Sequence, residues 1–167
     1  MRWNGTAIAT TFSTDTSVTA TVPATDLGDG STAAITVFNP APGGGSSAAA
    51  SFTVNNPPPV IAEVSPASVV AGSGTQTLDL MGTGFVPSST VEWNGAALAT
   101  LWVSATDLKA VLPASALGGS STSAVTVQNP APGGGTSAVE VFNITSPKPV
   151  LTSISPQIVP ARPGKLP

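Results

Sequence analysis

Carboxylates are the main side chains in this sequence that could do chemistry, because it contains no His and no Cys. Their absence removes imidazole bases, thiolate nucleophiles, zinc fingers, haem and iron–sulfur ligation, and disulfides. Paired carboxylates can hydrolyse a glycoside when they lie about 5 to 9 Å apart across a cleft. The candidates are Glu63, Asp79, Glu92, Asp107 and Glu140. No insertion between these residues is long enough to form the walls of a substrate cleft. We therefore expect the five carboxylates to lie on solvated strand faces, and we predict no catalytic residue.

A second kind of candidate is a metal site at residues 26–30, where Asp26 and Asp29 could offer oxygen ligands to calcium. Calcium prefers about six to eight oxygens from clustered carboxylates and carbonyls. The equivalent positions 90 residues later hold Ala116 and Gly119. A metal site would be expected to recur in both copies, so we interpret the segment as a polar turn. We predict no metal site and no cofactor.

Trp102 is the candidate for stacking against a ligand such as a sugar ring. It stands between Leu101 and Val103, so its side chain points to the opposite face of a strand from theirs. Aromatic residues on the strands of a sandwich are more often part of core or edge packing. The sequence leaves both interpretations open for Trp102, whereas Trp93 and its counterpart Trp3 are assigned to the core.

The composition argues against two classes of partner. Charged residues make up 8% of the chain, and its formal net charge is −3. A nucleic-acid-binding protein needs a clustered basic face, which few and scattered basic residues do not provide. These basic residues are Arg2, Lys109, Lys148, Arg162 and Lys165. No apolar run reaches the length of about 18 residues that a membrane helix needs, and no signal peptide is recognisable, so we expect no membrane span and no export signal in this segment.

The most informative feature of the sequence is an internal repeat of 90 residues. Trp-Asn-Gly occurs at 3–5 and again at 93–95, and Asn-Pro-Ala-Pro-Gly-Gly-Gly occurs at 39–45 and again at 129–135. Both pairs have the same offset, so no gap lies between them. A period of this length is too long for one turn of a solenoid and fits an autonomous sandwich domain.

The phase of the repeat divides the chain into three parts. Residues 57–146 form one complete repeat. Residues 1–56 form a partial repeat that lacks the first strands, since nothing in them corresponds to 57–92. Residues 147–167 correspond to the opening of a third repeat or a tail. We therefore predict that the chain is a segment of a tandem array of such repeats.

The complete repeat is predicted to be all-β. Gly and Pro occur 17 times each, which makes long helices improbable, while β-branched residues fill the short stretches between them. Turn signals recur at the spacing typical of a sandwich or barrel. The predicted strands are 60–64, 75–80, 90–93, 97–103, 107–112, 124–128 and 139–144.

Alternation along these strands predicts which side chains form the core. Asp79, Glu92 and Lys109 fall on the outward face of their strands. The last strand is ambiguous, and the first repeat decides it, because Phe52 matches Phe142 whereas Ser51 replaces Val141. The predicted core consists of Leu78, Leu80, Val91, Trp93, Leu108, Ala110, Leu112, Val125, Val127, Phe142 and Ile144.

Two kinds of turn punctuate each repeat. Asn-Gly at 4–5 and 94–95 lies between two strand-like runs, where a tight hairpin turn needs positive φ angles. The heptapeptides at 39–45 and 129–135 connect the last two strands. No Lys and no predicted helix follow their glycines, so they do not form a phosphate cradle.

The order and spacing of several motifs resemble the IPT/TIG family of immunoglobulin-like domains. The motifs are Pro-Val-Ile at 59–61, Val-Ser-Pro-Ala at 64–67, Gly-Thr-Gly-Phe at 82–85, Val-Glu-Trp-Asn-Gly at 91–95, Ala-Val-Leu-Pro-Ala at 110–114 and Val-Thr-Val-Gln-Asn at 125–129. The amino-acid sequence of the heptapeptide is similar to that found in the repeats of bacterial tandem arrays. The resemblance implies tandem immunoglobulin-like sandwiches with no shared catalytic residues. It also implies roles in binding, adhesion or spacing.

We therefore expect a non-enzymatic spacer or adhesion segment of a bacterial surface or secreted protein, located outside the cell. Its expected partners are proteins or glycans at a cell surface. The alternative is a carbohydrate-binding accessory module of a secreted polysaccharide-processing enzyme, with Trp102 as the stacking residue. Loss of glycan binding on Trp102→Ala would distinguish the two.

The incomplete first repeat also predicts self-association. Without the strands that match 60–64 and 75–80, part of its core face is expected to be open, and exposed apolar patches and open edges invite pairing. We expect residues 149–154 of one copy to add to the first repeat of another. The open face comprises Ile8, Val18, Val22, Ile35 and Val37.

Overall fold

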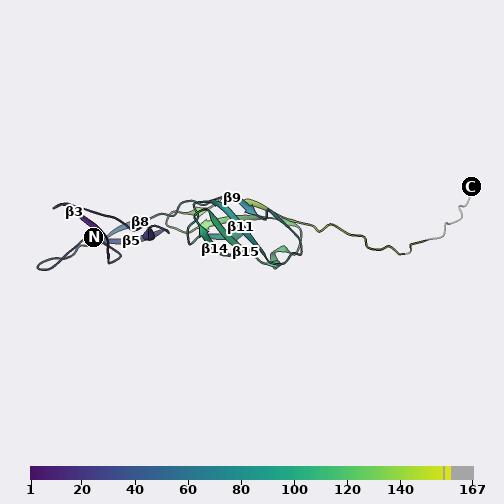
Figure 1. Cartoon of the computed structure of the whole chain (residues 1–167), viewed down its shortest axis with the longest axis horizontal. Helices are drawn as coiled ribbons and strands as arrows, with labels where there is room; N and C mark the ends of the chain where they lie inside the picture. Colours follow the sequence, from purple (N-terminus) through teal and green to yellow (C-terminus); the bar gives the residue numbers. More distant parts are fainter. Residues whose placement is uncertain (156, 159–167) are drawn as a thin grey trace, which may run out of the picture.

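The chain forms two β units that lie end to end and are followed by an extended segment at residues 147–155 (Figure 1). The structure is a computed structural model that describes residues 1–155, 157 and 158. Every sheet takes its strands from one side of Asn56 only. We name residues 1–56 unit 1, residues 57–146 unit 2 and residues 147–167 the tail, part of which lies outside the described residues.

Unit 2 contains two sheets that pack face to face. One sheet is antiparallel and has the strand order β14-β15-β11-β9. The other has the order β10-β18-β16-β12-β13, with β17 paired to β16. The strands are β9 (Val60–Ser65), β10 (Ser68–Val70), β11 (Gln76–Thr83), β12 (Thr90–Trp93), β13 (Ala96–Ala97), β14 (Ala99–Ser104), β15 (Asp107–Leu112), β16 (Ser121–Asn129), β17 (Gly135–Thr136) and β18 (Glu140–Thr145). The fold is thus an all-β sandwich.

The predicted core of unit 2 is confirmed, because every side chain assigned to it is buried. Trp93 and Phe142 meet edge to face, with ring centroids 5.2 Å apart. Burying a side chain of this size stabilises the fold by about 1.5–3 kcal/mol. The core also includes Phe85 and Leu117, which the strand pattern does not identify because they lie in a loop and in the short 3-10 helix η2 (Ala114–Leu117).

One predicted strand is wrong in its extent. Residues 97–103 do not form a single strand, because the chain leaves one sheet after β13 and enters the other at β14. At the crossing, the amide of Leu98 donates to the carbonyl oxygen of Val91 at 2.8 Å. The next contact is made by a side chain, since the amide of Val91 donates to Oγ1 of Thr100 at 3.0 Å. This hydrogen bond to a side chain takes the place of a backbone hydrogen bond between strands. The pairing of this segment with β12 therefore ends here.

Strand β10 was not predicted. Its three residues pair in parallel with β18, and Val69 stands opposite Ile144. Such a pairing joins segments far apart in the sequence and leaves no local alternation to detect.

Unit 1 repeats the second part of unit 2, from β12 onward. Its main sheet has the strand order β2-β1-β5-β8, beside the two hairpins β3–β4 and β6–β7. Trp3 and Phe52 lie with ring centroids 5.4 Å apart. The elements are β1 (Arg2–Trp3), β2 (Thr6–Ala7), β3 (Thr10–Thr14), β4 (Ser17–Ala20), η1 (Ala24–Asp26), β5 (Ser31–Thr36), β6 (Phe38–Asn39), β7 (Gly45–Ser46) and β8 (Ala50–Val54).

The Asn-Gly turns are confirmed in both units. Asn94 and Gly95 have φ angles of 51° and 80°, and Asn4 and Gly5 have φ angles of 48° and 85°. In each unit the Asn side chain also accepts a backbone hydrogen bond from the neighbouring strand, Asn94 from Ala124 at 2.8 Å. The turn is therefore encoded locally and forms identically in both copies.

Candidate interaction surfaces

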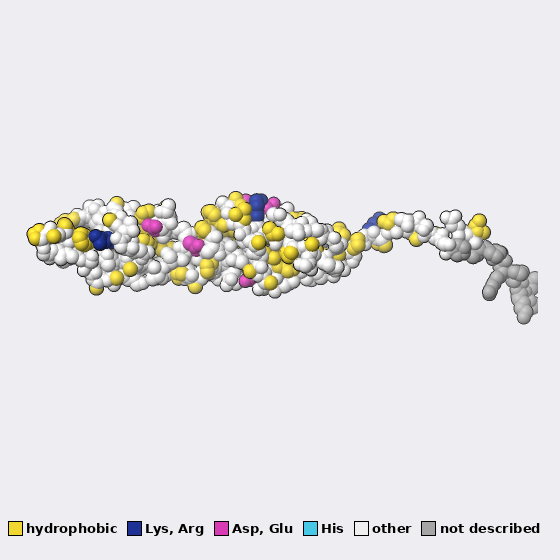
Figure 2. Space-filling model, turned by 90° about the horizontal axis from the view of Figure 1, so that it is seen from below, with side chains coloured by type: hydrophobic (Ala, Val, Ile, Leu, Met, Phe, Trp, Pro, Cys, Tyr) yellow, Lys and Arg dark blue, Asp and Glu magenta, His cyan; other side chains and the backbone are white. Residues whose placement is uncertain are grey.

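The carboxylates that could do chemistry do not gather in one place. In the part of the chain that the structure describes, no group of three or more acidic residues could hold a metal ion. Asp79 forms an ion pair with Lys109, and Glu92 accepts a hydrogen bond from Thr126 at 3.1 Å. These side chains occupy solvated faces of separate strands, and Figure 2 shows how sparse the charges are on the visible face.

The ion pair between Lys109 and Asp79 lies on the outer face of unit 2. Lys109 Nζ donates to Asp79 Oδ1 at 2.5 Å, and both side chains are more than two-fifths exposed. This hydrogen bond raises the pKa of Lys109 above its ordinary value, with smaller contributions from the charges of Asp79 and Asp107. Because the pair is exposed, water and salt screen it, and it contributes little to the stability of the fold.

Trp102 lies on β14, an edge strand of unit 2, and 37% of it is exposed. It stands opposite Leu108 across the β14–β15 pairing, and opposed residues of antiparallel strands point to the same face. Leu108 is fully buried, so Trp102 covers the edge of the core. Its exposed part is accessible to a ligand.

The inner face of unit 1 is much more exposed than the same face of unit 2. Phe52 is 47% exposed, whereas its counterpart Phe142 is 1% exposed. Val37 is 36% exposed, whereas Val127 is fully buried. The other residues predicted to be open, which are Ile8, Val18, Val22 and Ile35, are half-buried. The cause is the absence of counterparts to β9, β10 and β11 among the described residues of unit 1.

A hollow of about 280 Å³ marks this open face. Phe12, Val18 and Val37 line it, together with polar residues of the β3–β4 hairpin. Two of their counterparts, Leu108 and Val127, are fully buried in the core of unit 2, and the third, Trp102, lies at the sheet edge and is partly exposed. The open face therefore presents side chains that normally lie inside a sandwich.

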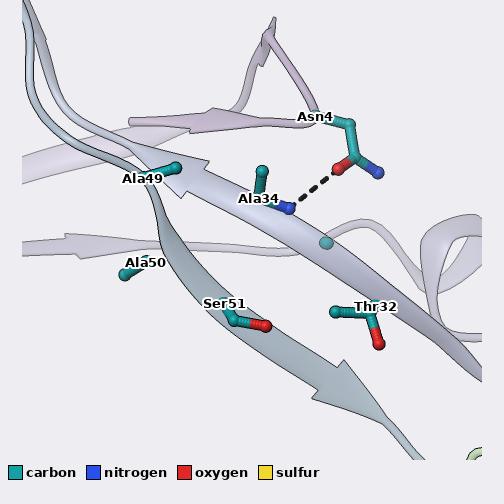
Figure 3. Close-up of a pocket in the computed structure, with 7 residues that line it drawn as sticks. Asn4, Thr32, Ala34, Ala49, Ala50 and Ser51 are labelled. Atoms are coloured by element: carbon teal, nitrogen blue, oxygen red, sulfur yellow. Dashed lines mark hydrogen bonds between the residues drawn. The ribbon is translucent and has the colours of Figure 1, made fainter.

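A second hollow, beside the main sheet of unit 1, offers no chemistry. It is lined by small residues of β5 and β8 and by Asn4, whose Oδ1 accepts a hydrogen bond from the amide of Ala34 at 2.8 Å (Figure 3). No ionisable side chain lines it. We assign it no function.

The junction between the two units is built around Asn56, which is 5% exposed. Its amide donates to the carbonyl oxygen of Pro132 and its carbonyl oxygen accepts from the amide of Gly134, both at 2.8 Å. Its side chain accepts from the amide of Gly30 at 2.6 Å and donates to the carbonyl oxygen of Pro130 at 2.9 Å. Asn56 thus bonds to unit 1 and to unit 2 at the same time.

Asp29, which the sequence assigns to a polar turn and not to a metal site, contributes to this junction. Its Oδ1 accepts hydrogen bonds from the amide of Gly30 at 2.9 Å and from the hydroxyl of Ser88 in unit 2 at 2.7 Å. Asp26 lies apart in η1. The sequence did not identify Asn56 as functional, and only the Asn-Pro step that ends the repeat could have drawn attention to it.

The heptapeptide turn of unit 2 is held firmly in its own sandwich by Asn129, which is 1% exposed. Its Nδ2 donates to the carbonyl oxygens of Pro57 at 2.8 Å and Gly84 at 2.7 Å. Its Oδ1 accepts from the hydroxyl of Ser89 at 2.6 Å. Both polar atoms of the Asn129 side chain therefore have partners within unit 2, so contacts inside this unit hold the turn in position.

The sandwich architecture, the motif order and the repeat point to one family. A model of the IPT/TIG domain family matches residues 59–144, which is about half of the chain. The chain belongs to the IPT/TIG family. A comparison with curated proteins finds no match. The IPT/TIG match covers β9 to β18, so it includes every strand that packs the core of unit 2.

The IPT/TIG fold is an immunoglobulin-like module that is suited to protein interaction. Unit 1 lies outside the matched range but shares the Trp-Asn-Gly and heptapeptide motifs with it. No helix in the described ranges is long and apolar enough to cross a membrane.

Proposed function

We propose that this IPT/TIG chain is a non-catalytic spacer and adhesion segment of a bacterial surface or secreted protein. The observation that supports it best is the direct joint between the units. Asn56 bonds to both, so consecutive sandwiches are held end to end without a free linker. A chain of such units separates whatever lies at its two ends by a set length.

The composition supports an extracellular setting. The chain has no Cys, so its stability comes from core packing and does not depend on the redox state of its surroundings. Its mild net charge of −3 discourages aggregation. An antibody raised against the chain should label intact cells, or the culture medium, of the organism that makes it. Labelling that requires permeabilised cells would overturn the location.

Small-angle X-ray scattering tests the spacer role. The chain should scatter as an elongated particle, and a variant with a second copy of residues 57–146 inserted after Ser146 should be longer by one unit. A particle whose maximum dimension does not grow with the added unit would contradict a spacer.

We propose self-association as a further part of this function. Unit 1 exposes a core face, and the tail exposes a segment that matches β9, one of the strands that cover this face in unit 2 together with β11. Val150, Leu151 and Ile154 are 80%, 82% and 61% exposed, and they correspond to Val60, Ile61 and Val64 of β9. The tail leaves unit 2 at the end away from unit 1 (Figure 1), which favours a second copy as its acceptor.

Light scattering across a concentration series tests this association. We expect oligomers that dissociate on dilution and that are lost in the double variant Leu151→Ser and Ile154→Ser. Val141→Ser is the matched control, since Val141 is an exposed apolar residue of unit 2 outside the tail. A monomer at high concentration, or oligomers that the double variant keeps, would overturn the proposal.

The alternative function, a carbohydrate-binding module, is supported by the remaining exposure of Trp102. It predicts binding on a glycan array that Trp102→Ala abolishes and that Leu101→Ala, on the opposite face of the same strand, preserves. The absence of binding to any glycan on the array would favour the spacer function.

A further inference from the structure

We propose that the heptapeptide turn is the docking surface through which one repeat receives the end of the preceding repeat, and that Asn56 is the residue recognised. This inference rests on the proposed spacer function and names the contact that sets its geometry. The partner that the turn fits is an extended segment ending in Asn followed by Pro, as at 55–57.

Three polar groups of Asn56 bond to the heptapeptide turn, and the fourth, the side-chain oxygen, bonds to Gly30 of its own unit. The backbone of Asn56 forms a two-way pair with Pro132 and Gly134, like an added strand, and this part is independent of residue type. The side chain adds the selectivity, because it must donate to Pro130 and accept from Gly30 at once. Among short side chains only a carboxamide carries both groups in this arrangement. Asp would lose the donor to Pro130, and Ala would remove both bonds, leaving the amide of Gly30 with Asp29 as its acceptor and the carbonyl oxygen of Pro130 without this donor.

Glycine at two positions gives Asn56 the room that it occupies. A Cβ built on Gly30 would lie 2.7 Å from Asn56 Nδ2 and 3.0 Å from the carbonyl oxygen of Pro132. A Cβ built on Gly133 would lie 2.6 Å from the carbonyl oxygen of Asn56. Contacts below 3.0 Å require the neighbours to move. The two surfaces therefore fit each other closely on both sides of Asn56.

The same turn in unit 1 shows the surface without its partner. Its sequence at 39–45 is identical, but a Cβ built on Gly43 meets nothing within 4 Å, whereas Gly133 meets Asn55 and Asn56. The close contacts of Gly133 therefore come from the preceding repeat and not from the turn itself.

The end of unit 2 differs from the end of unit 1 at the recognised position. Ser146 stands where Asn56 stands, and Ser120 stands where Gly30 stands. A serine hydroxyl is shorter than a carboxamide and has one donor hydrogen. We expect the joint formed after residue 146 to be held less firmly than the joint at Asn56.

Pulsed electron paramagnetic resonance on the full chain tests the docking. The chain has no native Cys, so cysteines introduced at the equivalent exposed positions Ser51 and Val141 can be spin-labelled selectively. The parent should give one narrow distance distribution. Asn56→Ala and Gly30→Ala should each lose the narrow peak.

Matched controls separate docking from folding. Asn55→Ala removes an exposed carboxamide next to Asn56, and Gly28→Ala adds a methyl where a Cβ meets nothing within 4 Å. Both should keep the narrow peak, and NMR signals of the buried core of unit 2 should show that this unit is folded in all variants. If Asn56→Ala keeps the narrow distance distribution, the docking proposal is wrong, whereas the proposed spacer function is unaffected. A broad distribution in the parent overturns both.

Discussion

Units 1 and 2 carry the same motifs, yet they differ in what those motifs achieve. Both form the Asn-Gly turn and the strand pairings around it. Leu27 is 46% exposed, whereas Leu117, at the same place in the repeat, is fully buried. Local sequence thus determines turns and hairpins in either unit, while burial depends on strands that come from elsewhere in the sequence.

The missing cover can be identified from unit 2. Strand β11 lies between β15 and β9 and brings Leu78 and Leu80 into the core. The counterpart of β15 in unit 1 is β4, which among the described residues pairs with β3 alone. No β11 counterpart covers unit 1 in this part of the chain, so the inner faces of β4 and β8 are open.

The largest difference is expected at the paired phenylalanines. Phe142→Ala should destabilise unit 2 by about 3–5 kcal/mol, because it removes a fully packed ring. Phe52→Ala should cost far less, because almost half of that ring is already exposed. Urea unfolding followed by NMR signals of each unit measures both. Equal losses would show that unit 1 has a packed core.

A smaller difference is expected at the paired asparagines of the heptapeptides. Asn129→Ala should cost about 2–3 kcal/mol, because it leaves the hydroxyl hydrogen of buried Ser89 without an acceptor and removes the donor to two carbonyl oxygens. Asn39→Ala should be nearly neutral, since Asn39 is exposed. The same urea titration compares them, and a large effect of Asn39→Ala would contradict the account.

The Asn-Gly turns should show no difference between the units. Asn94→Ala and Asn4→Ala should each cost about 1 kcal/mol, because Ala is strained at positive φ and loses the hydrogen bond to the neighbouring strand. Local amide exchange near each turn measures the effect. A clear effect in unit 2 alone would mean that the turn depends on the packed core.

The smallest effect is expected at the ion pair of unit 2. The folded-state pKa of Lys109 is raised, so its contribution is present below the ordinary Lys pKa of 10.5 and is lost as the pH rises through the folded value. Lys109→Met should remove this alkaline dependence and change the melting temperature at neutral pH only slightly. A large shift at neutral pH would mean that the pair is not screened by solvent.

The sequence predicts what is periodic or local and misses what is assembled over distance. The alternation of Leu108, Ala110 and Leu112 identifies their face, and Asn-Gly identifies its turn, because each depends on neighbouring residues. Phe85 and Leu117 lie in loop and 3-10 segments without alternation.

The junction was missed for the same reason. Asn56 bonds to Pro130 across 74 positions, and Asn129 bonds to Pro57 across 72. An asparagine before a proline looks like any loop residue until these partners are placed. The exposure of Trp102 was likewise undecided, since alternation gives its face but not that it lies on an edge strand.

Amide hydrogen exchange on the intact chain, at a concentration low enough to prevent association, tests most directly the claim that unit 1 lacks its cover. We predict that amides of β5 and β8 exchange at least about a hundredfold faster than those of β16 and β18, which corresponds to roughly 3 kcal/mol of missing burial. Equal protection of the two pairs of strands would contradict the account.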